Sequence, residues 1–314
     1  MIVGYLQRFV DQVTRRHPVL TLIARVLFII PGTKPVSRVL TRFAIQNLSL
    51  SLKNKQRLYN FFGAATAPRG SVAIKVKCAA RRKINLELDL HDELSRNWYY
   101  WEYEGYERAT VQLYKELLKS KFSVFDIGAN IGFYTLLAAS LMSRGEIHAF
   151  EAHPEVFECL QRNARLNRFR NAHMNHMAMS DKNGQVELFL PIDGDWTNAS
   201  LVAGFTAQNE TIAVESTRFD TYCDRNGVNR VDLVKIDVEG AELQVFHGMG
   251  RLLDAWLPDI ICEVLEPYEN ELDEFFCYKP YRKFLIRDDG IKEVKRIKAD
   301  SQFRDYYLSC SPVS

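Results

Sequence analysis

The chain has 314 residues, of which 47% are hydrophobic, 12% aromatic and 25% charged; this composition is typical of a globular protein and excludes a disordered one. Its length leaves room for a catalytic domain of about 200 to 250 residues with an appendage. The net charge of +2 conceals an uneven distribution, since residues 1–100 hold 17 Lys/Arg against 5 Asp/Glu and residues 101–314 hold 24 against 34. The basic N-terminal residues are predicted to contact phosphates or an anionic membrane surface, or to pack on the acidic remainder of the chain.

Residues 1–60 are predicted to form basic amphipathic helices, because apolar residues recur at helical spacing among ten Lys/Arg and a single acid. Such helices could lie in a membrane interface, cap a domain or join the subunits of a homodimer. The most apolar run, Val19–Ile30, has 12 residues and contains Arg25, so it is too short to span a bilayer. We therefore predict a helical extension over residues 1–68 and leave open whether it contacts a membrane peripherally or packs on protein.

The six cysteines are scattered, with no CxxC pair and no Cys/His metal spacing. Several fall inside apolar runs, such as Cys262 in DIICEV, where a free thiol behaves as a small hydrophobic group. This pattern indicates a reducing compartment. Because nothing resembles a cleavable signal peptide either, we expect a cytoplasmic protein, free or peripheral on the inner face of a membrane.

Alternating polar and apolar residues at Ser71–Cys78 and Ile84–Leu90 predict two paired antiparallel strands. This hairpin, at about residues 71–90, would open a catalytic domain that covers residues 69–314. An aromatic cluster follows at Trp98–Tyr106. Such a cluster could stack on a sugar or a base, but it more often forms core or interface.

Strand and helix patterns alternate through the rest of the chain, which predicts an α/β fold: a doubly wound, mainly parallel sheet with helices on both faces. Late strand-like segments (YRKFLIRD, IKEVKRI and RDYYLSC) would add an antiparallel edge. The other predicted strands are FSVFDI, GEIHAF, HMNHMAM, VDLVKI and DIICEV, and the predicted helices are Val111–Leu118, Phe133–Leu141, Pro154–Leu166, Ala241–Leu252 and Tyr268–Phe276.

The first strand of this series ends in the loop DIGANIG, from Asp126 to Gly132. In a doubly wound sheet, ligands bind beyond the carboxyl ends of the strands, and glycines let the backbone approach them closely. A dinucleotide site would have the spacing GxGxxG, which this loop lacks. The carboxylate of Asp126 would also crowd a pyrophosphate but suits a cationic ligand. The loop therefore favours S-adenosylmethionine, whose amino-acid end Asn130 could bind with both a donor and an acceptor.

An acid at the end of the second strand, Glu151, lies 25 residues after Asp126. There it could accept hydrogen bonds from both hydroxyls of a ribose, as NAD enzymes also require. Because the NAD and S-adenosylmethionine sites share this acid, Glu151 predicts a ribose contact without distinguishing the two cofactors. The loop that begins at Asp126 makes that distinction.

Acids cluster at the end of the predicted fourth strand, in KIDVEGAE, with Asp237, Glu239 and Glu242 within six residues. Because like charges raise one another's pKa, one of them could act as a base for a hydroxyl nucleophile. Asp237 and Glu239 could also hold a divalent cation, whereas Glu239 and Glu242 could merely stabilise the following helix. Glu263, at the tip of the fifth strand, is a further candidate.

The blocks VFDIGANIGFYTLLAA, HAFEAHPEVFECLQRNARLN, AMSDKNG and VDLVKIDVEGAELQVFHGM resemble FkbM-type methyltransferases, from about residue 71 to 310. The resemblance implies a seven-stranded Rossmann-like class I fold that uses S-adenosylmethionine, with cofactor contacts at Asp126, Gly128, Asn130, Gly132 and Glu151. It places Ala178 and Asp181 beside the adenine. It also implies that the acids of KIDVEGAE lie in the cleft that binds the cofactor. The AHP that follows Glu151 departs from the usual Pro or Asn.

The resulting hypothesis is methyl transfer to a hydroxyl of a glycan, a lipid-linked sugar or a secondary metabolite, with Asp237, Glu239 and Glu263 as catalytic residues; the preference for oxygen comes from the resemblance. No Asp/Asn-Pro-Pro-Tyr stretch occurs, which disfavours methylation of base amines, and we expect no specific nucleic-acid partner. Two other hypotheses stay open: a non-catalytic cofactor-binding adaptor at a membrane or partner, and an NAD-dependent oxidoreductase. His173 and His176 lie three apart on a predicted strand, so they face opposite sides and do not predict a metal pair.

Overall fold

A computed structural model describes residues 42, 70–79, 82–90, 93–101, 107–192, 199–205, 209–299 and 303–311. The predicted extension over residues 1–68 therefore lies outside the described residues, apart from Arg42. Tertiary contacts divide the chain into two compact units, residues 1–72 with 88–106 and residues 73–87 with 107–314. Among the described residues, no helix is both long and apolar enough to cross a membrane.

The described part of the smaller unit centres on helix α6, Glu93–Trp101. Three consecutive aromatic residues of this helix, Trp98, Tyr99 and Tyr100, are buried. The rings of Tyr99 and Tyr100 meet edge to face with centroids 5.0 Å apart, and the guanidinium of Arg42 lies 4.6 Å from the centroid of Tyr99. These residues of the aromatic cluster are therefore packed in the interior rather than displayed to a ligand.

The lead-in hairpin predicted at residues 71–90 is present as strands β1 (Ser71–Ala79) and β2 (Arg82–Asp89), which form a two-stranded sheet. Within the larger unit, side-chain amides of helix α9 (Pro154–Asn167) complete the hydrogen bonding of β2. Asn163 Oδ1 accepts from the backbone N–H of Glu87 at 2.6 Å, and Asn167 Oδ1 accepts from that of Asn85 at 2.8 Å. These bonds fix β2 against α9.

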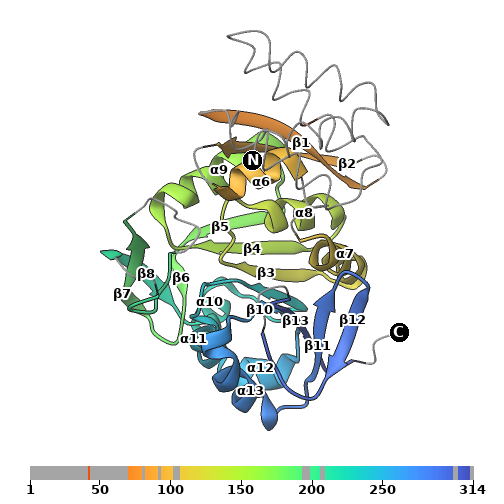
Figure 1. Cartoon of the computed structure of the whole chain (residues 1–314), viewed down its shortest axis with the longest axis vertical. Helices are drawn as coiled ribbons and strands as arrows, with labels where there is room; N and C mark the ends of the chain where they lie inside the picture. Colours follow the sequence, from red (N-terminus) through yellow and green to blue (C-terminus); the bar gives the residue numbers. More distant parts are fainter. Residues whose placement is uncertain are drawn as a thin grey trace, which may run out of the picture. The chain divides into compact units, whose positions relative to one another are not determined.

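The central sheet of the larger unit has eight strands in the order β12-β11-β13-β10-β9-β3-β4-β5 (Figure 1). Strands β5, β4, β3, β9 and β10 pair in parallel, and β13, β11 and β12 pair antiparallel at one edge. The α/β class and the antiparallel edge are thus confirmed, and β12 extends the expected seven strands by one. The bounds are β3 Ser123–Ile127, β4 Glu146–Glu151, β5 Ala172–His176, β9 Leu233–Ile236, β10 Asp259–Glu263, β11 Arg282–Arg287, β12 Gly290–Val294 and β13 Asp305–Ser309.

Helices cover both faces of this sheet. Strand β3 shows this, since its alternate side chains point to opposite sides and contact different helices. Phe125 and Ile127 pack against the helix that follows β9, whereas Asp126 bonds to the helix that follows β3. The helical bounds are α7 Arg108–Leu117, η3 Leu118–Ser120, α8 Phe133–Leu141, α9 as given above, α10 Phe219–Asn226, α11 Glu242–Met249, α12 Arg251–Trp256, η5 Glu266–Tyr268 and α13 Glu269–Cys277.

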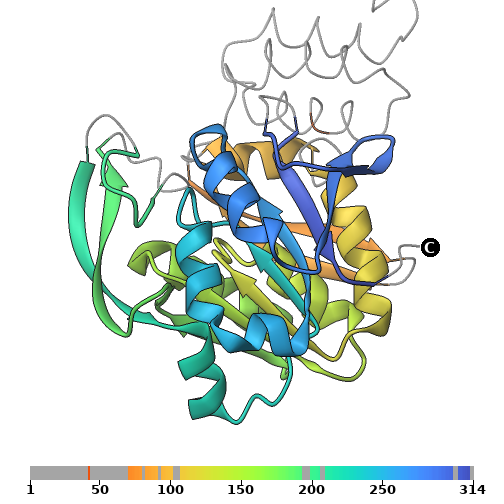
Figure 2. The same ribbon diagram turned by 90° about the horizontal axis from the view of Figure 1, so that it is seen from below.

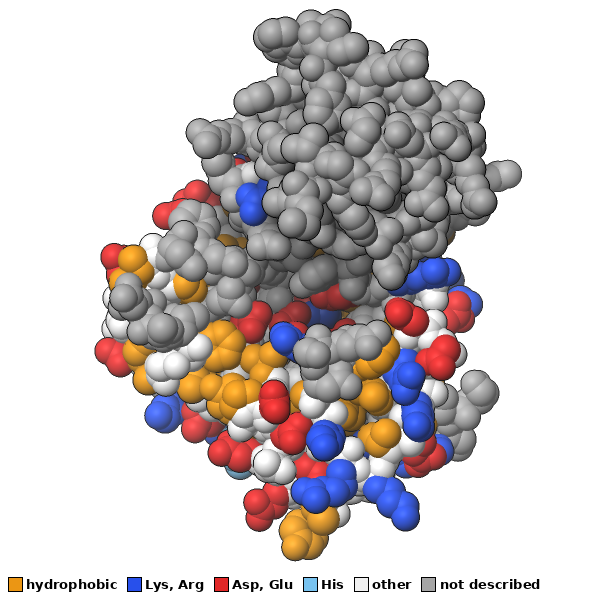
Figure 3. Space-filling model, viewed as in Figure 1, with side chains coloured by type: hydrophobic (Ala, Val, Ile, Leu, Met, Phe, Trp, Pro, Cys, Tyr) orange, Lys and Arg blue, Asp and Glu red, His pale blue; other side chains and the backbone are white. Residues whose placement is uncertain are grey.

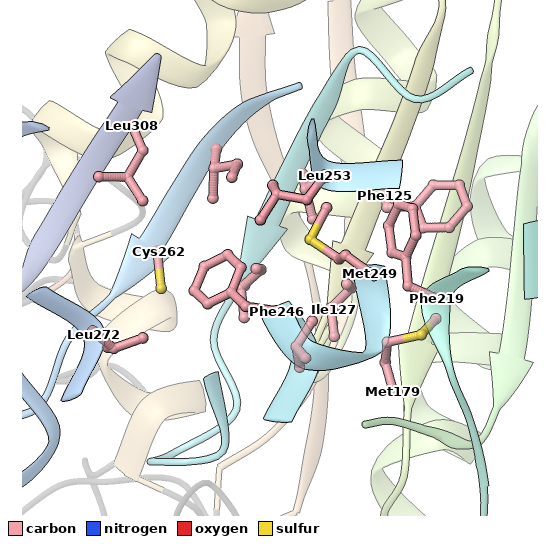
Figure 4. Close-up of a cluster of buried hydrophobic side chains, with 14 of the residues drawn as sticks. Phe125, Ile127, Met179, Phe219, Phe246, Met249, Leu253, Cys262, Leu272 and Leu308 are labelled. Carbon is pink, nitrogen blue, oxygen red and sulfur yellow. The ribbon is translucent and has the colours of Figure 1, made fainter. Parts of the chain in front are cut away.

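The helix predicted over residues 241–252 is interrupted in the structure. Gly250 adopts a φ of +54° between α11 and α12, which ends one helix and starts the next. Figure 4 shows the core beneath this break, where Phe246 and Met249 of α11 belong to the same buried cluster as Phe125 and Phe219. The apolar spacing alone does not reveal the interruption, because both short helices bury apolar residues against the same core.

A separate three-stranded sheet, in the order β6-β8-β7, lies between β5 and α10 in the chain. Figures 1 and 2 show β7 and β8 as an arm beside the central sheet. Its strands are β6 Ala178–Met179, β7 Gly184–Pro191 and β8 Asn209–Thr217, and Ala178, Leu188 and Val214 form its own small core. The sequence analysis did not predict β7, β8 or α10.

Candidate active site

The carboxyl group of Asp126 is buried near the end of β3, just before the loop between β3 and α8. Its Oδ2 accepts a hydrogen bond from Thr135 Oγ1 at 2.5 Å, and its buried Oδ1 has no hydrogen-bond partner among the described residues. Burial raises the pKa of Asp126, while the ammonium of Lys235 acts in the opposite direction. Asp126 therefore retains a free acceptor at the predicted cofactor loop, which fits a ligand with a donor group such as an ammonium.

Gly128 brings this loop against the loop that follows β9, at the point where the strand order reverses. Its backbone has a φ of +79°, and a Cβ placed there would lie 1.8 Å from the carbonyl oxygen of Asp237. Asp237 in turn donates its backbone N–H to Ile127 O at 3.0 Å. Ligands of doubly wound sheets bind beyond the strand ends at this reversal, so the two loops form the edge of a candidate binding site.

We expect Gly128→Ala to lower the free energy of unfolding by about 2–5 kcal/mol, because a left-handed backbone and an overlap act together. Gly227→Ala is the matched control, since Gly227 has a φ of +65° with no atom within 4 Å of a Cβ. The free energy of unfolding of that control should fall only by the cost of a left-handed backbone, about 1–2 kcal/mol. Urea unfolding of both variants measures the difference, and equal losses would contradict the close approach of the two loops.

Glu151 ends β4 and holds the cofactor loop through its carboxylate. Its Oε2 accepts from the backbone N–H of Asn130 at 2.9 Å, and its Oε1 accepts from that of His153 at 2.8 Å. Burial raises the pKa of Glu151 to about 7, although these backbone donors act to lower it. Glu151, the residue predicted to bind the ribose, thus lies directly beside the predicted glycine-rich loop.

Asn130 has a local role that the sequence analysis did not identify. Its backbone adopts a φ of +50°, a left-handed conformation that asparagine tolerates better than most residues. Its side-chain Oδ1 also accepts from the backbone N–H of Ile131 at 2.7 Å. These features explain an asparagine at this position by loop shape, and its predicted contact with the cofactor stays a prediction.

Two substitutions separate these roles of Asn130. If the residue only shapes the loop, Asn130→Gly should bind S-adenosylhomocysteine nearly as well as the unmodified protein, because glycine adopts positive φ without strain. Asn130→Ala should then bind more weakly than Asn130→Gly. If the side chain contacts the ligand, both variants should lose affinity to a similar extent. Isothermal titration calorimetry of the two variants measures the difference.

The loop after β9 carries Asp237 and Glu239 near the reversal of strand order. Asp237 Oδ2 accepts from Lys235 Nζ at 2.8 Å, and Glu239 has a φ of +52°, which is uncommon for a non-glycine residue. Glu242 is fully buried, and its Oε1 accepts from the backbone N–H groups of Gly240 at 3.1 Å and Val238 at 3.3 Å. Glu242 therefore stabilises the loop before α11, a structural role that differs from the helix stabilisation considered from the sequence.

Glu263, at the end of β10, joins Asp237 and Glu239, and one carboxylate oxygen from each of the three lies within 4.8 Å of the others. Burial and the charges of Asp237 and Glu239 raise the pKa of Glu263 to about 10. Burial, Asp237 and Glu242 raise that of Glu239 to about 8. The structure thus brings together the three predicted catalytic residues from two neighbouring strand ends.

Three further ionisable residues of this site were missed by the sequence analysis: Lys235, Glu107 and Asp305. Lys235 lies in the buried strand β9, and its ammonium lies 4.6 Å from the ring centroid of Tyr134. Glu107 accepts from the hydroxyl of Tyr134, and burial followed by the charge of Asp305 raises its pKa to about 8. A lysine within the apolar run VDLVKI was the one available signal, since Glu107 and Asp305 come from distant segments.

Acidic side chains (red) gather near the centre of the face drawn in Figure 3, beside apolar side chains (orange). Oxygen donors such as those of Asp237, Glu239 and Glu263 suit hard cations, including Mg²⁺, Mn²⁺ and Ca²⁺. The ammonium of Lys235 already compensates part of the negative charge. The predicted divalent cation at these carboxylates therefore fits the donor set and stays a prediction.

Glu263→Gln should stabilise the protein above neutral pH. The pKa of Glu263 is raised from its ordinary 4.5 to about 10, so stability that its protonated form provides is lost as the pH rises through this interval. The melting temperature of the variant should therefore exceed that of the unmodified protein at pH 8 and match it near pH 4.5. Glu266→Gln, an exposed neighbour, is the control. A difference independent of pH would contradict the raised pKa.

The two predicted adenine neighbours lie in different surroundings. Ala178 is buried in β6, next to the end of β5. The carbonyl oxygen of Asp181 accepts from Arg218 Nη1 at 3.0 Å, and Arg218 Nη2 also donates to the carbonyl of His247, in the last turn of α11. Asp181 is thereby placed near the end of α11 that is remote from Asp237. Adenine contacts at both residues stay predictions.

Comparisons with known proteins show the family of this chain. A family model described as the methyltransferase FkbM domain matches residues 126–283, half of the chain. The match begins at Asp126 and includes the cofactor loop, Glu151 and all three clustered acids. The chain belongs to this family of methyltransferase domains, as the resemblance predicted.

Individual relatives are more distant. The chain is 28% identical over 140 residues to the 2-O-methyltransferase NoeI of Sinorhizobium fredii, covering 40% of this chain and 56% of NoeI. It is 29% identical over 153 residues to the 31-O-demethyl-FK506 methyltransferase FkbM of Streptomyces tacrolimicus, covering 40% and 58%. The crystal structure of methyltransferase FkbM from Methylobacillus flagellatus KT matches with 16% identity and a TM-score of 0.40, covering 69% and 55%. The matched part thus spans little more than half of each of these proteins.

Proposed function

We propose that this chain transfers the methyl group of S-adenosylmethionine to a hydroxyl of a glycan, a lipid-linked sugar or another small molecule. The observation that carries this proposal is the meeting of two loops at the reversal of strand order. The first loop lies between Asp126, near the end of β3 with a buried Oδ1 that has no partner among the described residues, and Glu151, at the end of β4; the second loop carries Asp237. Neighbouring strand ends thereby offer a cofactor-binding edge and a carboxylate for an acceptor.

The cofactor fits the residues present. Glu151 would accept from the ribose hydroxyls, and the Asp126 oxygen that has no partner among the described residues would accept from a donor of the cofactor, while Gly128 lets the two loops pack together. S-adenosylmethionine supplies an activated methyl group when bound, so the protein need only align the acceptor and receive its proton. The loop lacks the GxGxxG spacing of dinucleotide sites, which argues against the NAD hypothesis.

Asp237 is proposed to receive the proton of the acceptor hydroxyl. One oxygen of its carboxylate accepts from Lys235 Nζ at 2.8 Å, and the other has no partner among the bonds of the described residues. The raised pKa values of Glu239 and Glu263, to about 8 and about 10, favour protonated side chains at pH 7. Those protonated groups can donate hydrogen bonds to other oxygens of the acceptor.

Oxygen as the methylated atom is supported by the names of the relatives. NoeI is described as a 2-O-methyltransferase and FkbM as a 31-O-demethyl-FK506 methyltransferase. Transfer of labelled methyl from S-adenosylmethionine to a panel of neutral glycans, lipid-linked sugars and polyols tests the proposal. We expect label in at least one neutral acceptor. Cofactor binding with no transfer across the whole panel would instead support the non-catalytic adaptor.

A further inference from the structure

A second group of metal-ligand side chains lies on β4 and β5, away from the candidate active site. Glu146 and His148 are two residues apart on β4 and therefore share a face of the sheet. His173 of β5 is the register partner of His148, so its side chain extends from the same face. Glu151 lies five residues beyond Glu146 along β4, a separation of about 17 Å. The group is therefore independent of the proposed methyl transfer.

Three donor atoms converge in this group. Glu146 Oε2 lies 3.5 Å from His173 Nε2 and 3.9 Å from His148 Nε2, and each of the three residues offers one ligand atom within 4.8 Å of those of the other two. Ligand atoms about 2.1 Å from a tetrahedral zinc ion are separated by about 3.4 Å. The side chains of His173 and Glu146 are 44% and 63% exposed, so they are free to make the small approach required.

A hydrogen-bond chain sets the tautomer of His148. The side-chain N–H₂ of Asn175 donates to the backbone carbonyls of Ala149 at 3.0 Å and His173 at 3.3 Å, which leaves its Oδ1 as an acceptor. The hydroxyl of Tyr222 donates to that Oδ1 at 3.2 Å, so its oxygen accepts from His148 Nδ1 at 2.8 Å. The proton then resides on Nδ1, and Nε2 keeps its lone pair on the side of Glu146 and His173.

In zinc sites, a ligating histidine donates its other ring N–H to a fixed acceptor, as His148 does to Tyr222 here. We propose that Glu146, His148 and His173 bind a zinc ion, with water in the fourth position. Two imidazoles and one carboxylate suit Zn²⁺ better than Mg²⁺ or Ca²⁺, which prefer oxygen ligands alone. Because β5 is the last strand in the sheet order, the ion would link an edge strand to its neighbour.

Zinc titration of the full-length protein tests this proposal. The protein is freed of metal with a chelator, reduced, and titrated with Zn²⁺ in excess Mg²⁺, which occupies all-oxygen sites. We expect His173→Ala and Glu146→Gln each to bind one equivalent less zinc than the unmodified protein, or to bind that equivalent at least tenfold more weakly. His176→Ala is the matched control, because His176 lies on the same strand with its side chain on the opposite face.

Thermal unfolding provides a second readout. Zinc at about 100 times its dissociation constant should raise the melting temperature by about 5 °C or more in the unmodified protein and in His176→Ala. The rise should be absent or much smaller in His173→Ala. Because both variants change exposed side chains, we expect them to fold. Equal stoichiometry, affinity and thermal shift in all four proteins would overturn the zinc site.

Discussion

Asp237→Asn should lower kcat/KM for methyl transfer by at least about 100-fold, the smaller part of the range that general bases contribute. The substitution keeps the shape of the side chain but removes the charge that Lys235 pairs with at 2.8 Å. S-adenosylhomocysteine should still bind, because the cofactor contacts proposed here come from Asp126 and Glu151. The experiment compares transfer rates at saturating cofactor, with calorimetry on the same preparations.

Asp254→Asn is the matched control for this effect, since Asp254 lies on α12 with a side chain that is 58% exposed. It should retain full activity. If Asp237→Asn also retained activity while folding normally, another group would have to accept the proton. In that case Glu239, whose pKa is raised to about 8, would be the next carboxylate to replace.

Glu151→Ala should weaken binding of S-adenosylhomocysteine at least tenfold. Each hydrogen bond from a ribose hydroxyl to this charged acceptor contributes roughly 1.5–3 kcal/mol. The structure adds a second cause, because the carboxylate also holds the backbone N–H groups of Asn130 and His153. Calorimetry measures the affinity, and Glu155→Gln, an exposed change four residues later, provides the control.

Glu151→Gln separates the two causes, because the amide keeps one acceptor oxygen of similar shape but loses the charge. We expect an affinity between those of the unmodified protein and Glu151→Ala. Binding that stays unchanged in a well-folded Glu151→Ala protein would remove Glu151 from the cofactor site.

The parts of the site that were predictable lie close together in the sequence. The strand, loop and helix from Phe125 to Leu141, and the acid that ends β4, follow from local patterns of apolar residues, glycines and charge. The parallel sheet and its antiparallel edge, which the structure confirms, were also predictable from such local patterns. Local spacing is sufficient where one element buries one continuous apolar face.

The parts that were missed depend on pairing across long distances in the chain. Glu107, Lys235 and Asp305 meet only because β13 pairs with β10 and β9 lies between β10 and β3. His148 meets His173 only through the register of β4 and β5. The arm formed by β7 and β8 buries alternate residues in a small core of its own, and the sequence analysis overlooked this alternation: Val186, Leu188, Leu190, Ile212 and Val214.

Asn130 illustrates a residue type that can have two reasons. The sequence analysis predicted that its side chain contacts the cofactor, which stays a prediction, and the structure adds a positive φ and a bond from the next backbone N–H. A single residue type can thus serve loop shape or ligand recognition, and the sequence alone does not separate them. Glu242 is a similar case, since its buried carboxylate accepts from loop N–H groups.

A crystal structure of the protein with S-adenosylhomocysteine tests the central claim most directly. The account predicts ribose hydroxyls within hydrogen-bond distance of Glu151 and the amino-acid end of the ligand at the loop from Asp126 to Gly132. The sulfur should face Asp237 across the cleft. An empty cleft at a saturating concentration of the ligand, or a ligand bound away from these two loops, would contradict it.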